Sequence, residues 1–405
     1  MYVIEMSSSF SECSKELSKS LSLTDKKQQG IYFTPKPIRD ILWEKLRELD
    51  VLNTNLSVLE PSAGSCEFIH DLIAMETSSQ IIGIEKNDII YKKAKEDVKQ
   101  YSNVKFINQD FLEYSTDEKF DIIIGNPPYF VTDIKEPKCM KGRGNIFVLF
   151  IYKCLTQHLK QDGVLAFILP TSFYNCGYYE PCRKFIKENT TILHVGNAEG
   201  GFIDTTQNTT LMIIKNKVNK KCFPEFFVDT ETGCYISPFY KELNKLLKHT
   251  TTLSDLNVIV KTGEVVWNQH KEKLVNEQSD DNTLVIYSSN IKDNKLVLGE
   301  LGGEKKQYIN NKFHKSPCEG PAICVSRGYG NSYMFDFVIV PTGMKFFGEN
   351  HVNVLLFDKV NDKDKVINKI LQSLNDERTK QFVKMFVGNG ALSKTEIQNI
   401  LPIFK

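Results

Sequence analysis

The sequence lacks the short motifs that mark a metal site or a redox pair. Its ten cysteines include no Cys-x-x-Cys pair, and its seven histidines include no His-Glu-x-x-His. The spacings between Cys176 and Cys182 and between Cys318 and Cys324 do not favour a metal either. We therefore predict free thiols in a reducing, cytoplasmic environment and a reaction without a bound metal.

Long apolar runs are also missing. The first twenty residues contain no apolar core of the kind that a secretory signal needs. The longest apolar run, Ile146–Tyr152, is far shorter than the roughly 20 residues that cross a bilayer. These absences argue against a secreted or membrane protein.

The sequence has no large excess of positive or negative charge. It contains 51 Lys and Arg residues and 50 Asp and Glu residues, for a net charge of +1. This balance excludes a generally polybasic nucleic-acid binder. The total is a sum of unequal halves: residues 1–215 carry 25 cations and 28 anions, and residues 216–405 carry 26 and 22. The basic surplus of the second half is small, so it permits DNA binding there without demonstrating it.

The 405 residues suggest two or three domains, at roughly 100–200 residues each. Residues 1–29 are rich in Ser and Lys, and we expect a mobile leader or one loose helix. A catalytic domain is expected over residues 30–240. A separate, mixed α+β domain is expected over residues 241–405, with a helix near Asp364–Leu374.

Short apolar runs alternate with segments of helical spacing from Gly30 to Asn216. Continuous apolar strands between amphipathic helices predict an α/β fold with a doubly wound, mostly parallel sheet of seven strands. The expected strands are Leu56–Glu60, Gln80–Glu85, Val104–Ile107, Phe120–Gly125, Gly163–Leu169, Ile192–Val195 and Thr210–Ile214. The expected helices are residues 66–75, 89–101, 146–159 and 180–188.

The tetrapeptide Asn126-Pro127-Pro128-Tyr129 follows the fourth strand, and ligands of such sheets bind beyond the carboxyl ends of the strands. It suits an amino group conjugated to a planar ring, because the Asn126 side-chain oxygen and a proline carbonyl can each accept one amino hydrogen. The prolines fix the backbone, and the tyrosine offers a stacking face worth about 1–3 kcal/mol per base. The plainer interpretation is a tight turn with an aromatic staple.

The first strand ends at Glu60 and is followed by small residues, among them Ala63 and Gly64, before a helix. Small residues let a ligand approach the backbone, and a helix N-terminus favours an anionic group. By itself this segment is equally well an ordinary turn. Glu85 strengthens the interpretation, because an acid at the end of the second strand can accept from ribose hydroxyls.

Asp110 and Phe111 follow the third strand, where they suit the amino group and the ring of an adenine, or equally a helix cap and a core phenylalanine. Together with Glu60 and Glu85 they indicate an adenosine-containing cofactor. A nicotinamide cofactor would leave Asn126–Tyr129 unexplained, whereas a methyl donor explains every feature.

With these motifs in order, the chain resembles the gamma class of adenine-N6 DNA methyltransferases of bacterial restriction-modification systems. The resemblance covers about residues 30–215. It rests on Gly30–Pro35, Glu60–Phe68, Glu85, Asp110-Phe111, Asn126–Tyr129 and Asp162–Pro170. It implies a class I methyltransferase sheet, S-adenosylmethionine as cofactor, double-stranded DNA as substrate and a separate cognate restriction endonuclease as a partner. One departure lies in the segment Ser62–Phe68, which we call the cofactor loop. Many relatives carry more glycine there.

The resemblance also implies roles for single residues. It places Tyr32 and Thr34 in the cofactor site, with Thr34 at a helix start binding the methionine carboxylate. It implies that the adenine is extruded from the duplex and stacked between Tyr129 and Phe202. Phe202 follows two glycines, and a core phenylalanine at a glycine turn is the alternative.

The second half supplies candidate DNA contacts. Residues 261–271 mix an aromatic ring, amides and cations, and amides suit adenine in the major groove whereas lysine suits phosphate. The glycine-rich segments 326–332 and 387–394 suit a close approach to a backbone, although each is more often a surface turn. The candidates are Lys261, Trp267, Asn268, Gln269, Lys271 and Arg327.

Other functions share parts of this pattern. Asn-Pro-Pro-Tyr also occurs in methyltransferases of RNA bases and of release-factor glutamine, but the protein-modifying class is not expected to need the large C-terminal domain. An RNA adenine methyltransferase and a catalytically inactive, DNA-binding partner are therefore the alternatives. We expect no fused nuclease.

Overall fold

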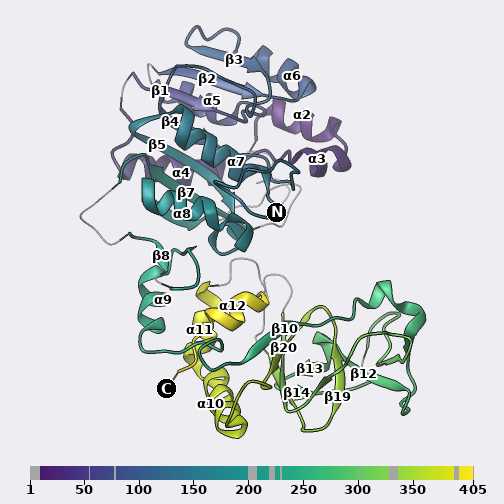
Figure 1. The fold of residues 1–405 in the computed structure, drawn as a ribbon. Coiled ribbons are helices and arrows are strands. Elements are labelled where there is room, and N and C mark those ends of the chain that lie inside the picture. The colour runs from purple at the N-terminus through teal and green to yellow at the C-terminus, as the bar shows by residue number, and fades with distance from the viewer. Residues whose placement is uncertain are drawn as a thin grey trace. The chain divides into compact units, whose positions relative to one another are not determined.

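The computed structural model describes residues 10–53, 55–76, 79–198, 208–218, 224–228, 230–299, 301–327, 336–386 and 392–404. The chain divides into two compact units (Figure 1). The first unit comprises Met1–Asp229 and Gly233–Tyr240, and the second comprises Thr230–Thr232 and Lys241–Lys405. No helix among these described residues is long and apolar enough to cross a membrane.

A seven-stranded sheet in the order β3-β2-β1-β4-β5-β7-β6 forms the centre of the first unit (Figure 1). Its neighbouring strands are parallel except at β7, which runs antiparallel to both β5 and β6. This is a doubly wound, mostly parallel sheet of seven strands, as predicted. The strands are β1 (Ser57–Glu60), β2 (Gln80–Glu85), β3 (Val104–Asn108), β4 (Phe120–Gly125), β5 (Leu159–Pro170), β6 (Thr191–Asn197) and β7 (Thr209–Lys215).

Helices cover both faces of this sheet, because alternate residues of each buried strand point to opposite sides. Val58 and Ile122 belong to one apolar core, which also includes side chains of α2, α4, α5 and α6. Leu59 and Ile123 belong to the other core, with α7 and α8. The helices are α2 (Glu12–Ser20), α4 (Lys36–Glu48), α5 (Glu67–Ala74), α6 (Asp88–Val98), α7 (Ile146–Lys153) and α8 (Glu180–Asn189).

The sequence predicted a mobile leader or one loose helix, whereas the described residues 10–29 form two capped helices, α2 and α3 (Leu23–Gln29). The serines that resembled a polar linker are helix caps: Ser11 accepts from the Ser14 amide, and Ser22 caps α3 in the same way. The buried side of α2 is narrow and consists of Cys13, Ser14 and Leu17, so only two apolar residues mark this helix in the sequence.

The predicted helix over residues 146–159 is shorter than expected. It ends at Lys153, a π-helical turn spans Cys154–His158, and the extended backbone of β5 begins at Leu159. Cys154, Leu155, His158 and Leu159 are buried, whereas Thr156 and Gln157 are exposed. This is the spacing of a helix, so the sequence does not distinguish the π-helical turn from a continued α-helix.

The second unit is mixed α+β, as predicted. It contains an antiparallel sheet in the order β10-β20-β17-β18 and a mixed sheet in the order β11-β15-β12-β19-β16. The first sheet comprises β10 (Ile259–Thr262), β20 (Val352–Leu356), β17 (Ala322–Ser326) and β18 (Phe337–Val340). The second comprises β11 (Leu274–Val275), β15 (Tyr308–Asn310), β12 (Asn282–Ile286), β19 (Lys345–Gly348) and β16 (Cys318–Glu319).

The remaining elements are short hairpins and helices. The hairpins are β8 (Phe227–Val228) with β9 (Tyr235–Ile236) and β13 (Ile291–Lys292) with β14 (Lys295–Leu296). The helices are α9 (Tyr240–Leu247), α10 (Lys363–Asn375), α11 (Glu377–Phe386) and α12 (Lys394–Asn399). The helix predicted near Asp364–Leu374 is α10.

Candidate active site

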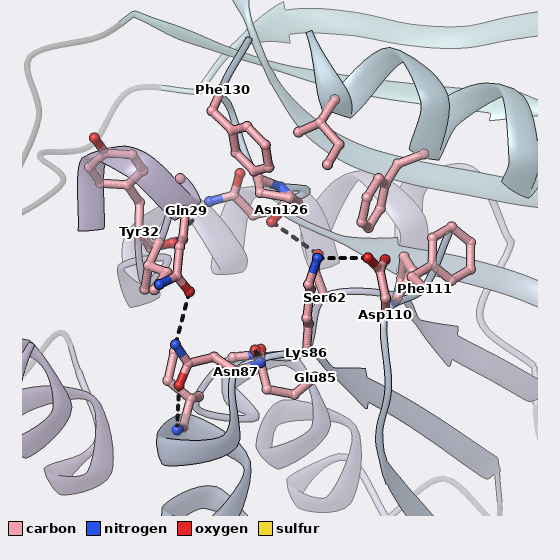
Figure 2. A pocket seen from close by; sticks show the side chains of 18 of the residues that line it. Gln29, Tyr32, Ser62, Glu85, Lys86, Asn87, Asp110, Phe111, Asn126 and Phe130 are labelled. Atoms are coloured by element: carbon pink, nitrogen blue, oxygen red, sulfur yellow. Dashed lines mark hydrogen bonds and ion pairs between the residues drawn. The ribbon is translucent and has the colours of Figure 1, made fainter. Parts of the chain in front are cut away.

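A pocket lies beyond the carboxyl ends of the strands, where the strand order reverses between β1 and β4 (Figure 2). Successive strand ends contribute Gly64, Glu85, Asp110 and Asn126 to its lining. Residues 28–33, from the last two residues of α3 into the segment before α4, close another side. The topology therefore brings together residues that the sequence places far apart.

Glu85 is held in place by the backbone of the cofactor loop. Its carboxylate accepts from the amides of Gly64 (2.9 Å) and Asn87 (2.6 Å). Burial raises the pKa of Glu85 to about 7, and hydrogen bonds from the backbone amides of Asn87, Gly64 and Lys86 oppose that rise. An acid with this pKa is ready to accept hydrogen bonds from a ligand near neutral pH.

Glu60, at the end of β1, is only 2% exposed, and its Oε2 has no hydrogen-bond partner among the described residues. Burial raises the pKa of Glu60 well above its usual value, while the positive charge of Arg39 opposes the shift. A buried carboxyl oxygen without a partner is costly, so this atom points to a missing donor or cation.

Asp110 also lies at the pocket, but both of its oxygens have partners. Oδ1 accepts from the Leu112 amide (2.9 Å), and Oδ2 lies 2.7 Å from Lys86 Nζ (Figure 2). Phe111 is buried beside it and packs against the Phe150 ring at 4.9 Å. A ligand amino group would therefore share the Asp110 carboxylate with Lys86.

Hydrogen bonds hold both the nitrogen and the oxygen of the Asn126 side-chain amide. Nδ2 donates to the Tyr32 carbonyl (3.3 Å) and to Thr34 Oγ1 (3.2 Å). Oδ1 lies 2.5 Å from the Tyr129 hydroxyl, which is also 2.7 Å from the Ile168 carbonyl oxygen. Burial raises the pKa of Tyr129 well above its usual value, so this hydroxyl keeps its proton. One hydroxyl proton serves only one of these two acceptors at a time.

Arg39 of α4 joins the segment before the sheet to the helix after the cofactor loop. Its guanidinium donates to the Thr34 carbonyl (2.6 Å), and it pairs with Asp71 (2.7 Å) and Glu67 (2.9 Å) of α5. The three ion-pairing side chains are at most 15% exposed, so little water screens the network. Thr34 is thus held from its carbonyl by Arg39 and from its hydroxyl by Asn126.

Gly30 brings the end of α3 against the Asn-Pro-Pro-Tyr backbone. Its φ of +65° ends the helix in the left-handed conformation. A Cβ at this position would lie 2.6 Å from the Tyr129 nitrogen and 3.2 Å from the Pro128 carbonyl carbon. Only glycine satisfies both conditions without displacement.

The sequence of this chain has clear relatives among known proteins. The model of the Eco57I restriction-modification methylase family matches residues 15–201. The chain is 31% identical over 401 residues to the type II methyltransferase M.CvrRI of Paramecium bursaria Chlorella virus XZ-6E, a match that covers 98% of this chain and 99% of that protein. The chain belongs to the type II methyltransferases of restriction-modification systems. Its cofactor is S-adenosylmethionine, and it methylates DNA at specific sites.

Two further proteins are similar to the chain, one in sequence and one in structure. The modification methylase CviBIII of Paramecium bursaria Chlorella virus NC1A is 28% identical over 405 residues, and the match covers 98% of this methyltransferase and 99% of that protein. A solved structure of a class I S-adenosylmethionine-dependent methyltransferase assigned in Listeria monocytogenes is 17% identical. That match covers 53% of this chain and 68% of the other, with a TM-score of 0.43.

Most of the residues predicted for the methyltransferase site surround this pocket or its walls. Those that line the pocket are Tyr32, Gly64, Glu85, Asp110, Phe111, Asn126 and Pro128. Glu60, Thr34, Ala63, Pro127 and Tyr129 are placed behind this lining; Ala63, for example, donates its amide to the Ile84 carbonyl. Phe202 lies outside the described residues. No group of three or more metal-ligating side chains occurs in the part of the chain that is described.

The sequence analysis missed several lining residues of the methyltransferase pocket. Gln29 and Lys86 reach the pocket from α3 and from the end of β2, and Gln29 accepts from Asn87 Nδ2 at 2.9 Å (Figure 2). Phe130 and Ile146 line it from either end of the segment between them. Lys86 directly follows Glu85, and Phe130 directly follows Tyr129. This adjacency to predicted site residues is the one sign in the sequence that they line the pocket.

The candidate DNA contacts of the methyltransferase lie in the second unit. Trp267 is in a 3₁₀ turn, with Lys271 and Lys305 at 5.4 Å and 5.8 Å from its ring. Asn268 and Gln269 are exposed beside it, and Lys261 is exposed on β10. Arg327 donates to the Asn350 carbonyl (3.1 Å), and its buried Nε has no partner among the described residues. Residues 328–332 and 387–391 of the glycine-rich segments lie outside the description.

Proposed function

We propose that this methyltransferase acts on the exocyclic N6 amino group of an adenine that is extruded from duplex DNA. The observation that carries the proposal is the fixed Asn126 amide at the pocket. Its two amide hydrogens are committed to Tyr32 and Thr34, so its Oδ1, which meets the Tyr129 hydroxyl in this structure, can act only as an acceptor. An acceptor held in this way selects a substrate with an N–H donor.

The cofactor roles are part of the proposal. The Glu85 carboxylate would accept from ribose hydroxyls, and Asp110 and Phe111 would hold the adenine ring. Tyr32, in the pocket lining, and Thr34, behind it, would bind near the methionine end. The unpartnered Oε2 of Glu60 is suited to the cofactor's ammonium group. Gly64, with a φ of +54° and only the Phe33 ring near its Cβ position, lets a ligand approach the backbone. S-adenosylmethionine, when bound, supplies the electrophilic methyl group.

Asn126 and Tyr129 would then act on the target adenine. When the adenine amino group donates to Asn126 Oδ1, the Tyr129 hydroxyl can turn its proton to the Ile168 carbonyl, which lies 2.7 Å away. The carbonyl of Pro127 would accept the second amino hydrogen. The Tyr129 ring would stack on one face of the base, and we keep Phe202 as the proposed residue for the other face. These residues would act by orienting the amine. Correct orientation removes a large part of the barrier in such transfers.

The second unit would read the DNA sequence, and its proposed contacts are the residues around Trp267 together with Lys261 and Arg327. The lysines beside the Trp267 ring would contact phosphates, and the ring itself would offer a stacking surface. The exposed amides of Asn268 and Gln269 suit hydrogen bonds to base edges. A separate cognate restriction endonuclease and a reducing, cytoplasmic setting complete the proposal.

The test is modification-sensitive sequencing of DNA from cells that express the wild-type chain or Asn126→Ala. We expect N6-methyladenine at one fixed sequence with the wild type and a loss of at least two orders of magnitude in transfer with the variant, which should still bind S-adenosylmethionine. Methylation of cytosine, labelling of RNA alone, or near-normal transfer by Asn126→Ala would each contradict the proposal.

A further inference from the structure

The first unit carries a locally basic segment at the mouth of the pocket, although its half of the sequence is acidic. Residues 131–145 contain Lys135, Lys138, Lys141 and Arg143 against two carboxylates, Asp133 and Glu136. All four cations are exposed. Lys141 pairs with Glu180, whereas the other three make no ion pair among the described residues. This segment follows directly on the Asn-Pro-Pro-Tyr motif.

Both ends of segment 131–145 arise from the pocket wall. Phe130 and Ile146 line the pocket, and the Ile146 amide donates to the Phe130 carbonyl at 3.0 Å. Val131 pairs with Asn145 as an antiparallel bridge, and the Thr132 amide donates to the Gly144 carbonyl. Whatever binds the exposed residues near the two ends of this segment is therefore next to the pocket.

The middle of the segment is anchored in the core. Cys139 and Met140 are 0% and 4% exposed, and the Cys139 carbonyl accepts from the Cys182 amide at 3.0 Å. The Lys141 amide donates to the Tyr178 carbonyl at 2.9 Å. The segment is thus a built feature of the first unit, and its exposed side chains project from a fixed backbone.

Three large apolar or aromatic side chains are exposed beside these cations. Val131 is 48% exposed, Ile134 is 49% exposed, and Tyr178 is 47% exposed. The Tyr178 ring lies over Gly142, whose Cβ position is 3.0 Å from the ring, between Lys141 and Arg143 in the chain. Exposed apolar residues among cations suit a partner that presents phosphates next to flat, apolar faces.

We propose that segment 131–145 and Tyr178 form a second DNA contact, on the catalytic unit itself, which grips the strand around the extruded adenine. Lys135, Lys138 and Arg143 contact the flanking phosphates. Val131 and Ile134, close in the chain to Tyr129, fill the step that the adenine leaves, and Tyr178 stacks on a neighbouring base. This inference rests on the proposed extrusion of the base, and it goes beyond the reading of the sequence by the second unit.

The phosphate part is tested with Lys138→Ala/Arg143→Ala. Binding of the full chain to a fluorescent duplex with its recognition site is measured over a range of salt, with S-adenosylhomocysteine present. The dissociation constant should rise at least tenfold, and the salt slope should fall by about 0.9 for each lost contact. The matched control is Lys92→Ala/Lys105→Ala, which removes two exposed lysines from α6 and β3 and should bind as the wild type does. The dissociation constant for S-adenosylmethionine reports correct folding.

The apolar part is tested with Val131→Ser/Ile134→Ser and a duplex that carries 2-aminopurine at the target adenine. We expect a smaller rise in 2-aminopurine fluorescence than in the wild type, with the salt slope unchanged. Wild-type binding by Lys138→Ala/Arg143→Ala, together with wild-type fluorescence of the serine variant, overturns this inference while adenine methylation by the wild type stands. A wild type that methylates cytosine, or that binds an RNA hairpin and no duplex, overturns the proposed function instead.

Discussion

Gly30 packs its backbone against the nitrogen of Tyr129, so closely that a Cβ on Gly30 would lie 2.6 Å from that atom. This contact joins the end of α3 to the residues that are proposed to hold the target base. It makes the segment before the sheet a part of the active site, because movement of one backbone requires movement of the other.

The first prediction concerns Gly30→Ala. The left-handed conformation costs a non-glycine residue roughly 1–2 kcal/mol, and the contact with Tyr129 adds to that cost. We expect a lower melting temperature and a fall in kcat larger than the change in cofactor affinity. Gly302→Ala, in open space without a positive φ, should alter neither quantity. Equal behaviour of the two variants would show that the contact does not matter.

The second prediction concerns the Tyr129 hydroxyl. Tyr129→Phe removes the hydrogen bond to Asn126 or Ile168 but keeps the ring. A lost neutral hydrogen bond is worth about 0.5–1.5 kcal/mol, so kcat should fall between about twofold and tenfold. Tyr129→Ala also loses the stacking face, so its kcat should fall much further. Single-turnover rates at saturating cofactor measure both, and equal losses in the two variants would contradict the separate role of the ring.

The third prediction concerns pH. The ionised carboxylate of Glu85 is the form that accepts from ribose hydroxyls, and its pKa is about 7. Affinity for S-adenosylmethionine should therefore increase as the pH rises from 6 to 8, by roughly tenfold, and then level off. Glu85→Gln should bind more weakly and without this step. Calorimetry at several pH values measures it, and a flat wild-type profile would contradict it.

Glu85 also affects the stability of the protein without cofactor. Its folded pKa lies above its usual 4.5, so the folded state holds the proton more tightly than the unfolded state. The free energy of unfolding should thus fall as the pH rises from about 4.5 to 7. Glu85→Gln removes this loss, so at pH 8 it should melt at a higher temperature than the wild type although it binds cofactor worse.

The fourth prediction concerns Arg39. Arg39→Ala leaves Glu67 and Asp71 buried without their cation, which typically costs about 3–5 kcal/mol. Urea unfolding should show a loss of this size, and Arg39→Lys should recover only part of it because a lysine cannot reproduce the fork. Lys36→Ala breaks an exposed pair with Asp40 on the same helix and should change little. Similar losses for the two alanine variants would argue against a special role of the buried network.

The sheet and the strand-end residues could be predicted because they depend on local pattern. Buried parallel strands are continuous apolar runs, and the residue after each run lies at one edge of the sheet by topology alone. Glu85 and Asn126 were found in this way. The hydrogen bond from Asn126 to the Tyr32 carbonyl was not, since it joins residues 94 apart in the chain and depends on how α3 and α4 pack.

The errors of prediction have equally local causes. Helix α2 buries only Cys13, Ser14 and Leu17, and one of these is a serine, so its apolar stripe was too narrow to recognise. The partners of Glu67 are Ser11, Ser14 and Arg39, residue types that occur on any surface, and only their burial distinguishes them.

The contacts of α2 and α3 bear on the order in which the molecule is made. Ser14 bonds to Glu67, which is 53 residues later, and the Tyr32 carbonyl accepts from Asn126, 94 residues later. At about 5–20 residues per second, the first segment leaves the ribosome several seconds before the strands that it packs on. These residues must therefore wait, with their apolar side exposed, until β4 and Asn126 are made, and the pocket is complete only when Ile146 and Phe150 of α7 follow.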